Sequence, residues 1–177
     1  MVRKNIDVNT IVEVKNNLED SFIYDGRDNQ LRLSGRDVSD SLSVRELKST
    51  MAGQKRRNLM EFYILLDYTD DEDISVDDVL EYIRLKEHYN KAKEILGVQE
   101  DEQLDTHHFT EFVEVANKKM MDEALTELPE LITVLTEQGI KAYKNNNIDA
   151  GAVESLIRFN GIDDVHSFLD DLRSSYS

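Results

Sequence analysis

The spacing of apolar residues separates a short N-terminal part with strand-like patterning from a long helical remainder. Phe22 and Tyr24 alternate with Ile23, Leu31 and Leu33 alternate with Arg32, and residues 25–29 between the two runs have the sequence Asp-Gly-Arg-Asp-Asn. Two alternating runs on either side of an Asp-Gly turn predict a β-hairpin. A lone hairpin is only marginally stable in water, so we expect it to pack on the helices or on a partner chain.

Two further segments of the N-terminal part flank this hairpin. Asn9 or Thr10 is placed to cap a short helix with Ile11, Val14 and Leu18 on one side. Residues 35–42 are polar and rich in Ser and Asp, which makes them the best linker candidate. We therefore divide the chain into an N-terminal segment with the hairpin, residues 1–42, and an acidic helical domain, residues 43–177, of which residues 146–177 form a terminal helical hairpin.

From residue 43 onward, apolar residues recur at helical spacing. Ser43 and Glu46 have the spacing of a capping box for a first helix that ends near Gly53. Ser75 caps a helix whose apolar face continues through residues 82–96 and stops at Gly97. Further helices are expected where apolar residues cluster, at 59–66, at 109–128 up to Pro129, at 131–144, at 153–159 and at 165–172. The sequence therefore predicts a mainly α fold, a helical domain of about six or seven helices with a small N-terminal β-hairpin.

Composition narrows the class of protein. The 177 residues include no cysteine, which excludes disulfide scaffolds, thiolate zinc sites and cysteine nucleophiles. The longest apolar run, residues 62–66, is far shorter than the roughly 20 residues that a membrane span needs, and residues 1–7 contain no apolar signal region. We expect a soluble cytoplasmic protein that does not contact a membrane.

Charge is distributed unevenly along the chain. The formal net charge is −16, but residues 1–60 hold 11 Lys or Arg and 9 Asp or Glu, a balance of +2, and residues 61–177 hold 10 and 28, a balance of −18. Such a field repels nucleic acids and anionic membranes and attracts basic partners. We expect no direct nucleic-acid binding and a protein partner with a basic surface; the alternative is that the acidic residues serve solubility alone.

Residues 67–78 are the best match to a metal-binding motif. Asp67, Thr69 and Asp71 supply oxygen atoms at positions 1, 3 and 5 of an EF-hand calcium loop. However, Glu72 stands where the sharp turn requires glycine, and Asp78 stands where a longer glutamate normally coordinates through both oxygens. The pattern therefore favours an acidic loop followed by a capped helix.

The histidines give a second, incomplete metal pattern. His107 and His108 lie with Glu111 at a helix start preceded by Asp105, whereas His88 and His166 stand apart. A metal site needs three or four convergent ligands, and local spacing supplies only part of a set. We predict no metal ligand and no cofactor-binding residue.

Signals for catalysis and for DNA binding are equally sparse. The sequence has no glycine-rich phosphate loop, no nucleophile-elbow serine and no pair of histidines at zinc-protease spacing, so we predict no catalytic residue and no enzymatic activity. Residues 151–177 have the outline of a helix-turn-helix around Gly161, but the second helix carries four aspartates and one cation, Arg173, which disfavours contact with phosphates. The single basic cluster, residues 55–57, lacks interleaved aromatic residues.

In general character the chain resembles bacteriophage-encoded accessory proteins such as tail-assembly chaperones and inhibitors of host proteins: it is small, acidic, rich in Asn and Asp, and has a hairpin before a helical body. No motif carries this resemblance, so it implies no functional residue. Our first hypothesis is a non-enzymatic protein-binding protein, an adaptor, assembly factor or inhibitor. The alternatives are an acidic DNA mimic that occupies a nucleic-acid-binding protein, and a metal-binding or enzymatic helical domain. We also consider a weak homo-oligomer in which residues 1–42 form the contact arm.

Overall fold

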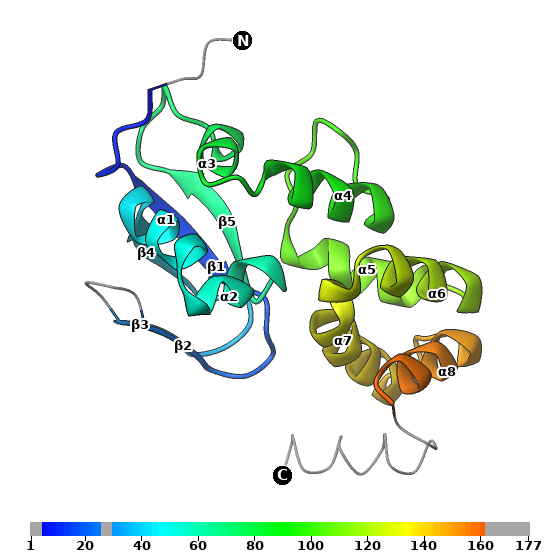
Figure 1. The fold of residues 1–177 in the computed structure, drawn as a ribbon. Helices are drawn as coiled ribbons and strands as arrows, with labels where there is room; N and C mark the ends of the chain where they lie inside the picture. The colour runs from blue at the N-terminus through cyan, green and yellow to red at the C-terminus, as the bar shows by residue number, and fades with distance from the viewer. Residues whose placement is uncertain (1–4, 26–29, 162–177) are drawn as a thin grey trace.

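The structure, a computed structural model, describes residues 5–25 and 30–161. Within these ranges it contains eight α-helices, two 3₁₀-helices and five short strands near the N-terminal end of the chain, which confirms the mainly α prediction (Figure 1). Strands β1 (Ile11–Asn16), β4 (Ser39–Ser43) and β5 (Ile64–Thr69) form an antiparallel sheet in the order β4-β1-β5. Strands β2 (Phe22–Asp25) and β3 (Gln30–Leu33) form the predicted hairpin.

The predicted helix around residues 9–18 is wrong, because this segment is β1. Val12, Val14 and Asn16 are fully buried and alternate with more exposed neighbours, the period-two pattern of a strand. The helical spacing of Ile11, Val14 and Leu18 is a coincidence that long-range pairing with β4 and β5 overrides.

The linker predicted at residues 35–42 is also wrong over its second half, which belongs to β4. Leu42 lies opposite Val12 in the sheet and is buried, whereas Ser39 and Ser41 lie opposite Lys15 and Glu13. The polar composition fits the position of β4 at the edge of the sheet, where Leu42 is the one buried residue of the strand.

Helices α1 (Val44–Ala52) and α2 (Arg57–Met60), linked by the 3₁₀-helix η1 (Gln54–Arg56), lie over one face of the sheet (Figure 1). The helix predicted over residues 59–66 is wrong, because α2 ends at Met60 and the chain turns at Phe62, whose φ is 61°, into β5. Ile64, Leu65 and Leu66 are all buried in this strand. A continuous apolar run of this length fits a buried strand as well as a helix, so periodicity does not distinguish the two.

Helices α3 (Val76–Tyr82) and α4 (Lys86–Leu96) replace the single helix expected from Ser75 to Leu96. The break lies at Arg84, whose φ is 63°. Both predicted ends are confirmed: Ser75 and Asp78 form a capping box, and Gly97 ends α4 with a φ of 73°. Ser43 likewise caps α1 by accepting a hydrogen bond from the amide of Glu46.

The remaining described helices are α5 (Thr106–Val115), α6 (Lys118–Glu127), α7 (Ile132–Lys144) and α8 (Ala150–Phe159), with the 3₁₀-helix η2 (Pro129–Leu131) before α7. The long helix expected from 109 to 128 is two helices, because Ala116 is extended and the Asn117 side chain caps α6. Pro129 follows the end of α6, as predicted. The last expected helix, at 165–172, and His166 lie outside the described residues.

One main hydrophobic core joins the strands, the hairpin and the helices. Tyr24, Leu31 and Leu33 of the hairpin are buried in the same cluster as Leu47 of α1 and Phe109 of α5. The hairpin therefore packs on its own chain. No helix in the described ranges is long and apolar enough to cross a bilayer.

Candidate functional site

The most extensive polar cluster among the described residues lies at the junction between the N-terminal segment and helices α5 and α7, and Arg36 is at its centre. The Arg36 guanidinium donates to the Thr110 hydroxyl at 2.8 Å, to the Thr106 carbonyl at 2.6 Å and to the Asn17 side-chain oxygen at 3.2 Å. Thr106 in turn donates through its hydroxyl to Asp37. Arg36 thus ties the segment before β4 to α5.

Gln138 of α7 extends the cluster. Its side chain is almost fully buried, accepts from the Thr110 hydroxyl at 2.9 Å and donates to Glu19 at 2.7 Å. The Glu137 carboxylate accepts from the Glu19 amide at 3.0 Å. Burial raises the pKa of Glu137, with a further contribution from the neighbouring charges of Glu19 and Asp20. Each of these contacts lies within one chain, so the cluster fits a role in holding the N-terminal segment against helices α5 and α7.

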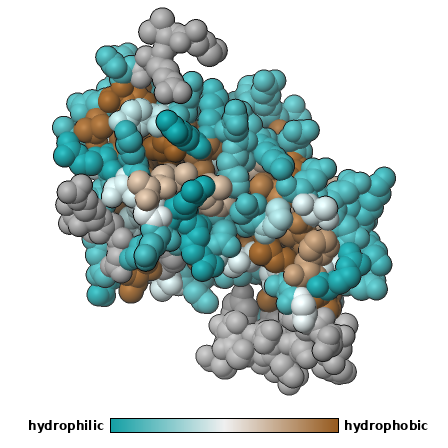
Figure 2. Space-filling model, viewed as in Figure 1, coloured by the Kyte–Doolittle hydropathy of each residue, from teal (hydrophilic) through white to brown (hydrophobic). Residues whose placement is uncertain are grey.

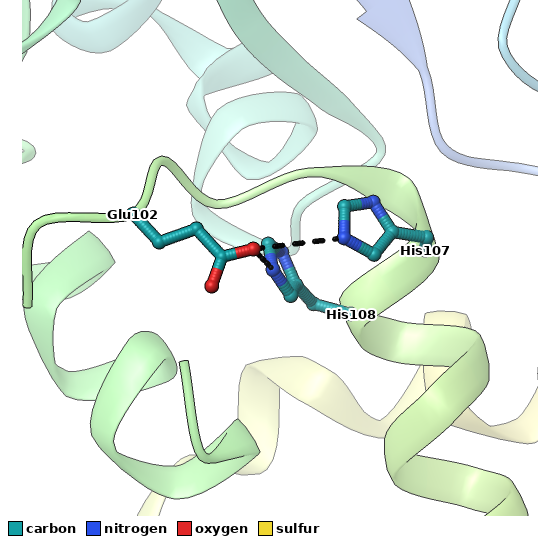
Figure 3. A group of neighbouring side chains, drawn as sticks. All are labelled: Glu102, His107 and His108. Carbon is teal, nitrogen blue, oxygen red and sulfur yellow. Dashed lines mark hydrogen bonds and ion pairs between the residues drawn. The ribbon is translucent and has the colours of Figure 1, made fainter. Parts of the chain in front are cut away.

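The predicted histidine pair lies in a second cluster, at the start of α5 (Figure 3). Oxygen Oε1 of Glu102 is 2.8 Å from Nε2 of His108 and 3.8 Å from Nε2 of His107. Ligand atoms of the three residues lie within 4.8 Å of one another, and no other such group of three occurs among the described residues. Glu111, the expected companion of the histidines, is not part of this group; Glu102, from the preceding loop, is.

The hydrogen bonds of His108 show that this cluster fits a helix cap better than a metal centre. Nδ1 of His108 accepts from the Asp105 amide at 2.9 Å and closes the capping box of α5. In the neutral ring Nε2 must then carry the proton, which it donates to Glu102. A metal ion binds Nε2 only through a free lone pair, so the proton of the neutral ring must then move to Nδ1. Nδ1 can no longer accept from the Asp105 amide, and the cap is lost. The hydrogen bond from His108 lowers the pKa of Glu102.

In the acidic segment that resembles an EF-hand loop, carboxylates accept hydrogen bonds from backbone amides of the same segment. Asp67 lies inside β5 and Asp78 inside α3, so the two ends of the motif do not frame a loop between two helices. Asp71 accepts from the amide of Asp73, and Asp78 accepts from the amide of Ser75. These contacts match the acidic loop and capped helix favoured by the sequence.

The other residues singled out in the sequence have structural partners. Nε2 of His88 lies 2.6 Å from the Met60 carbonyl, and its ring stacks on Phe62. In the basic cluster, Arg57 donates to Glu61 at 2.8 Å and to the Tyr63 hydroxyl at 3.0 Å. The apolar face at 82–96 is core, because its members Leu85, Tyr89, Ala92 and Leu96 are buried.

Sequence patterns gave no sign of the Arg36 cluster. Arg36 lies in the stretch interpreted as a linker, and its partners are 19 to 74 residues away along the chain. The only available signal was a single arginine among Ser, Gly and Asp, which does not distinguish a buried side chain from an exposed one.

Comparisons with known proteins add no relationship. No protein-family model, no curated protein and no solved structure matches the chain.

Proposed function

We propose that the protein is a non-enzymatic cytoplasmic binding protein, an adaptor, assembly factor or inhibitor of the kind that bacteriophages encode, and that it binds a protein partner with a basic surface. The observation that carries this proposal is the exposure of its acidic residues. Residues 61–161 contain 24 Asp or Glu and 9 Lys or Arg, and 16 of these 24 acidic residues are exposed, the other eight being partly buried. A field of this sign accelerates encounter with a basic surface and disfavours nucleic acids.

The described polar clusters support a binding role over a catalytic one. Arg36, Glu102 and His108 are each engaged in hydrogen bonds that hold helices in place. A general acid or base acts on a substrate within hydrogen-bond reach of it, whereas the hydrogen bonds of these three residues go to the protein's own groups.

The test is affinity capture from a host lysate, followed by kinetics with the purified partner. We expect a stoichiometric partner of basic surface charge whose association rate falls steeply between about 0.05 and 0.3 M salt while its dissociation rate changes little. A triple variant, Asp70→Asn, Glu72→Gln and Asp73→Asn, should lower the association rate, because these side chains line an open acidic hollow with Asp7. A partner without a basic surface, or an association rate unaffected by salt, would contradict the proposal.

Competition with duplex DNA separates the proposal from DNA mimicry. If short duplex DNA displaces the captured partner at one-to-one stoichiometry, the protein occupies a nucleic-acid site and the mimic is the better description. If the partner binds DNA and this protein simultaneously, mimicry is excluded.

A weak homo-oligomer remains a separate proposal. Sedimentation velocity at low salt should show concentration-dependent association through residues 1–42. Since the hairpin is part of the main core, the contact should be tested by substitutions at Ile23, which is 53% exposed, rather than by deletion of the segment.

A further inference from the structure

A pocket of about 720 Å³ lies between α1, α3 and the chain around Ile6, and no residue of the Arg36 cluster or of the Glu102–His107–His108 group lines it. Its volume falls within the roughly 300–1,000 Å³ of small-molecule sites. In Figure 2 apolar surface is exposed between the places that α1 and α3 occupy in Figure 1, with strongly hydrophilic side chains next to it. Ile6, Met51 and Tyr82, which contribute to the lining, are only partly buried.

The pocket has more cations than carboxylates in its lining, whereas the whole protein is acidic. Three cations, Lys48, Arg56 and Arg84, line it together with two carboxylates, Asp78 and Glu81. Both carboxylates are engaged elsewhere. Asp78 accepts from the amide of Ser75 in the cap of α3, and Glu81 lies 3.9 Å from the Lys86 ammonium.

The two arginines, by contrast, have no ion pair and no side-chain hydrogen bond with any residue that the structure describes. Both side chains are exposed. In a chain with a net charge of −16, two such cations at one pocket form a local site for negative charge.

The backbone position of Arg84 is unusual for an arginine. The amide of Leu85 donates to the Leu80 carbonyl at 2.8 Å and that of Arg84 to the Glu81 carbonyl at 3.2 Å, the two bonds of a Schellman motif that ends α3. Arg84 occupies the left-handed position of this motif, with a φ of 63°, where glycine is the favoured residue. A bulky residue at a left-handed position is strained, so the turn alone does not explain why an arginine stands here.

Tyr82 supplies an aromatic wall beside the cations. The Lys48 ammonium donates to the Tyr82 hydroxyl at 3.2 Å and lies 4.7 Å from the centre of its ring. The pocket therefore combines an aromatic ring and apolar side chains with positively charged groups, the combination that binds an anionic group attached to an apolar body.

We propose that this pocket binds a small organic anion, in which a carboxylate, phosphate or sulfonate contacts Arg56 and Arg84 and a flat apolar group lies against Tyr82 and Met51. The site is independent of the proposed acidic interaction surface: it binds an anion, whereas that surface is proposed to bind a basic partner.

The test uses anilinonaphthalene sulfonate as the anionic probe and N-phenylnaphthylamine as its uncharged counterpart, with binding followed by fluorescence titration. The wild-type chain should bind the sulfonate more tightly than the neutral probe. Arg84→Gly and Arg56→Gln should each weaken sulfonate binding about tenfold, the loss of one charge-assisted contact, and leave neutral-probe binding unchanged. Lys91→Gln, an exposed cation on α4 outside the pocket, is the matched control and should change neither.

Arg84→Gly also separates binding from folding. Because glycine suits the left-handed position, this variant should melt at the same temperature as the wild type or higher while losing sulfonate affinity. Amide chemical-shift changes on titration should concentrate at residues 48–56 and 78–84. Equal affinity of Arg84→Gly and wild type for the sulfonate, equal binding of the two probes, or shifts centred elsewhere would each overturn the proposal.

Discussion

Replacing Arg36 by alanine should destabilise the whole molecule, because this side chain joins the N-terminal segment to α5. Its guanidinium makes three hydrogen bonds, to Thr110, Thr106 and Asn17, and its side chain is only 11% exposed. Truncation leaves the fully buried Asn17 without that donor and removes one partner of the Thr106 carbonyl.

The size of the effect follows from these contacts. A hydrogen bond to a charged group contributes about 1.5–3 kcal/mol, but three bonds from one group are not additive. Nε of Arg36 is buried without a hydrogen-bond partner, a cost that the truncation removes. We therefore expect a net loss of about 3 kcal/mol, a large share of the roughly 5–15 kcal/mol that stabilise a typical domain.

Urea unfolding followed by circular dichroism measures this loss. With a slope of about 2 kcal/mol per molar urea, the midpoint should fall by more than 1 M. The control is Arg45→Ala, because Arg45 is exposed and its side chain makes one 3.4 Å hydrogen bond, to Asn9, within the described part of the chain, so its loss should stay within about 0.5 kcal/mol. If the two variants unfold at the same urea concentration, Arg36 does not join the two parts and the reasoning fails.

Three further substitutions test individual groups. Burial raises the pKa of Glu137 above its ordinary 4.5, so the native state retains a proton that the unfolded state releases. The free energy of unfolding should therefore fall as pH rises from about 4.5. Glu137→Gln should abolish that fall, as measured by urea titrations at several pH values. Tyr24→Phe removes a buried hydroxyl that has no hydrogen-bond partner and should raise the free energy of unfolding by about 1 kcal/mol, whereas a decrease would reveal a missed contact. His108→Leu should cost about 1–3 kcal/mol by removing the acceptor of the Asp105 amide, and calorimetric titration of the wild type with zinc should show no stoichiometric binding.

Local sequence signals located those elements whose ends are set by neighbouring residues. Ser75 and Asp78 satisfy each other's backbone amides within one turn, and Gly97 adopts a left-handed conformation available to it at no steric cost. The hairpin was predictable for the same reason, since only four residues separate its two strands along the chain. In each case the stabilising contact lies within a few residues of the signal.

The strands of the three-stranded sheet depend on partners far away in the sequence. β1 pairs with β5, some 50 residues later, and that pairing decides that residues 11–16 are extended although part of their spacing also fits a helix. The same limit applied to the sites. The Arg36 cluster, the Glu102–His108 contact and the pocket at Arg84 each join residues from different elements, and a one-dimensional pattern contains no distance between them.

Two cations of residues 1–60, Lys15 and Arg36, are engaged with other groups in the folded chain. Lys15 from the first 60 residues lies 3.1 Å from Asp105 and 3.9 Å from Asp67; burial lowers the pKa of Lys15, but the hydrogen bond and charge of Asp105 and the charge of Asp67 together raise it above its ordinary value. Arg36 is held by hydrogen bonds to two threonines of α5 and lies 3.9 Å from the Glu19 carboxylate. Lys15 therefore pairs with carboxylates of the acidic part within one molecule, and neither Lys15 nor Arg36 is free to attract a second copy. Arg56 and Arg84 keep their charge exposed at the pocket, so the proposed anionic ligand has cations to bind although the chain as a whole is acidic.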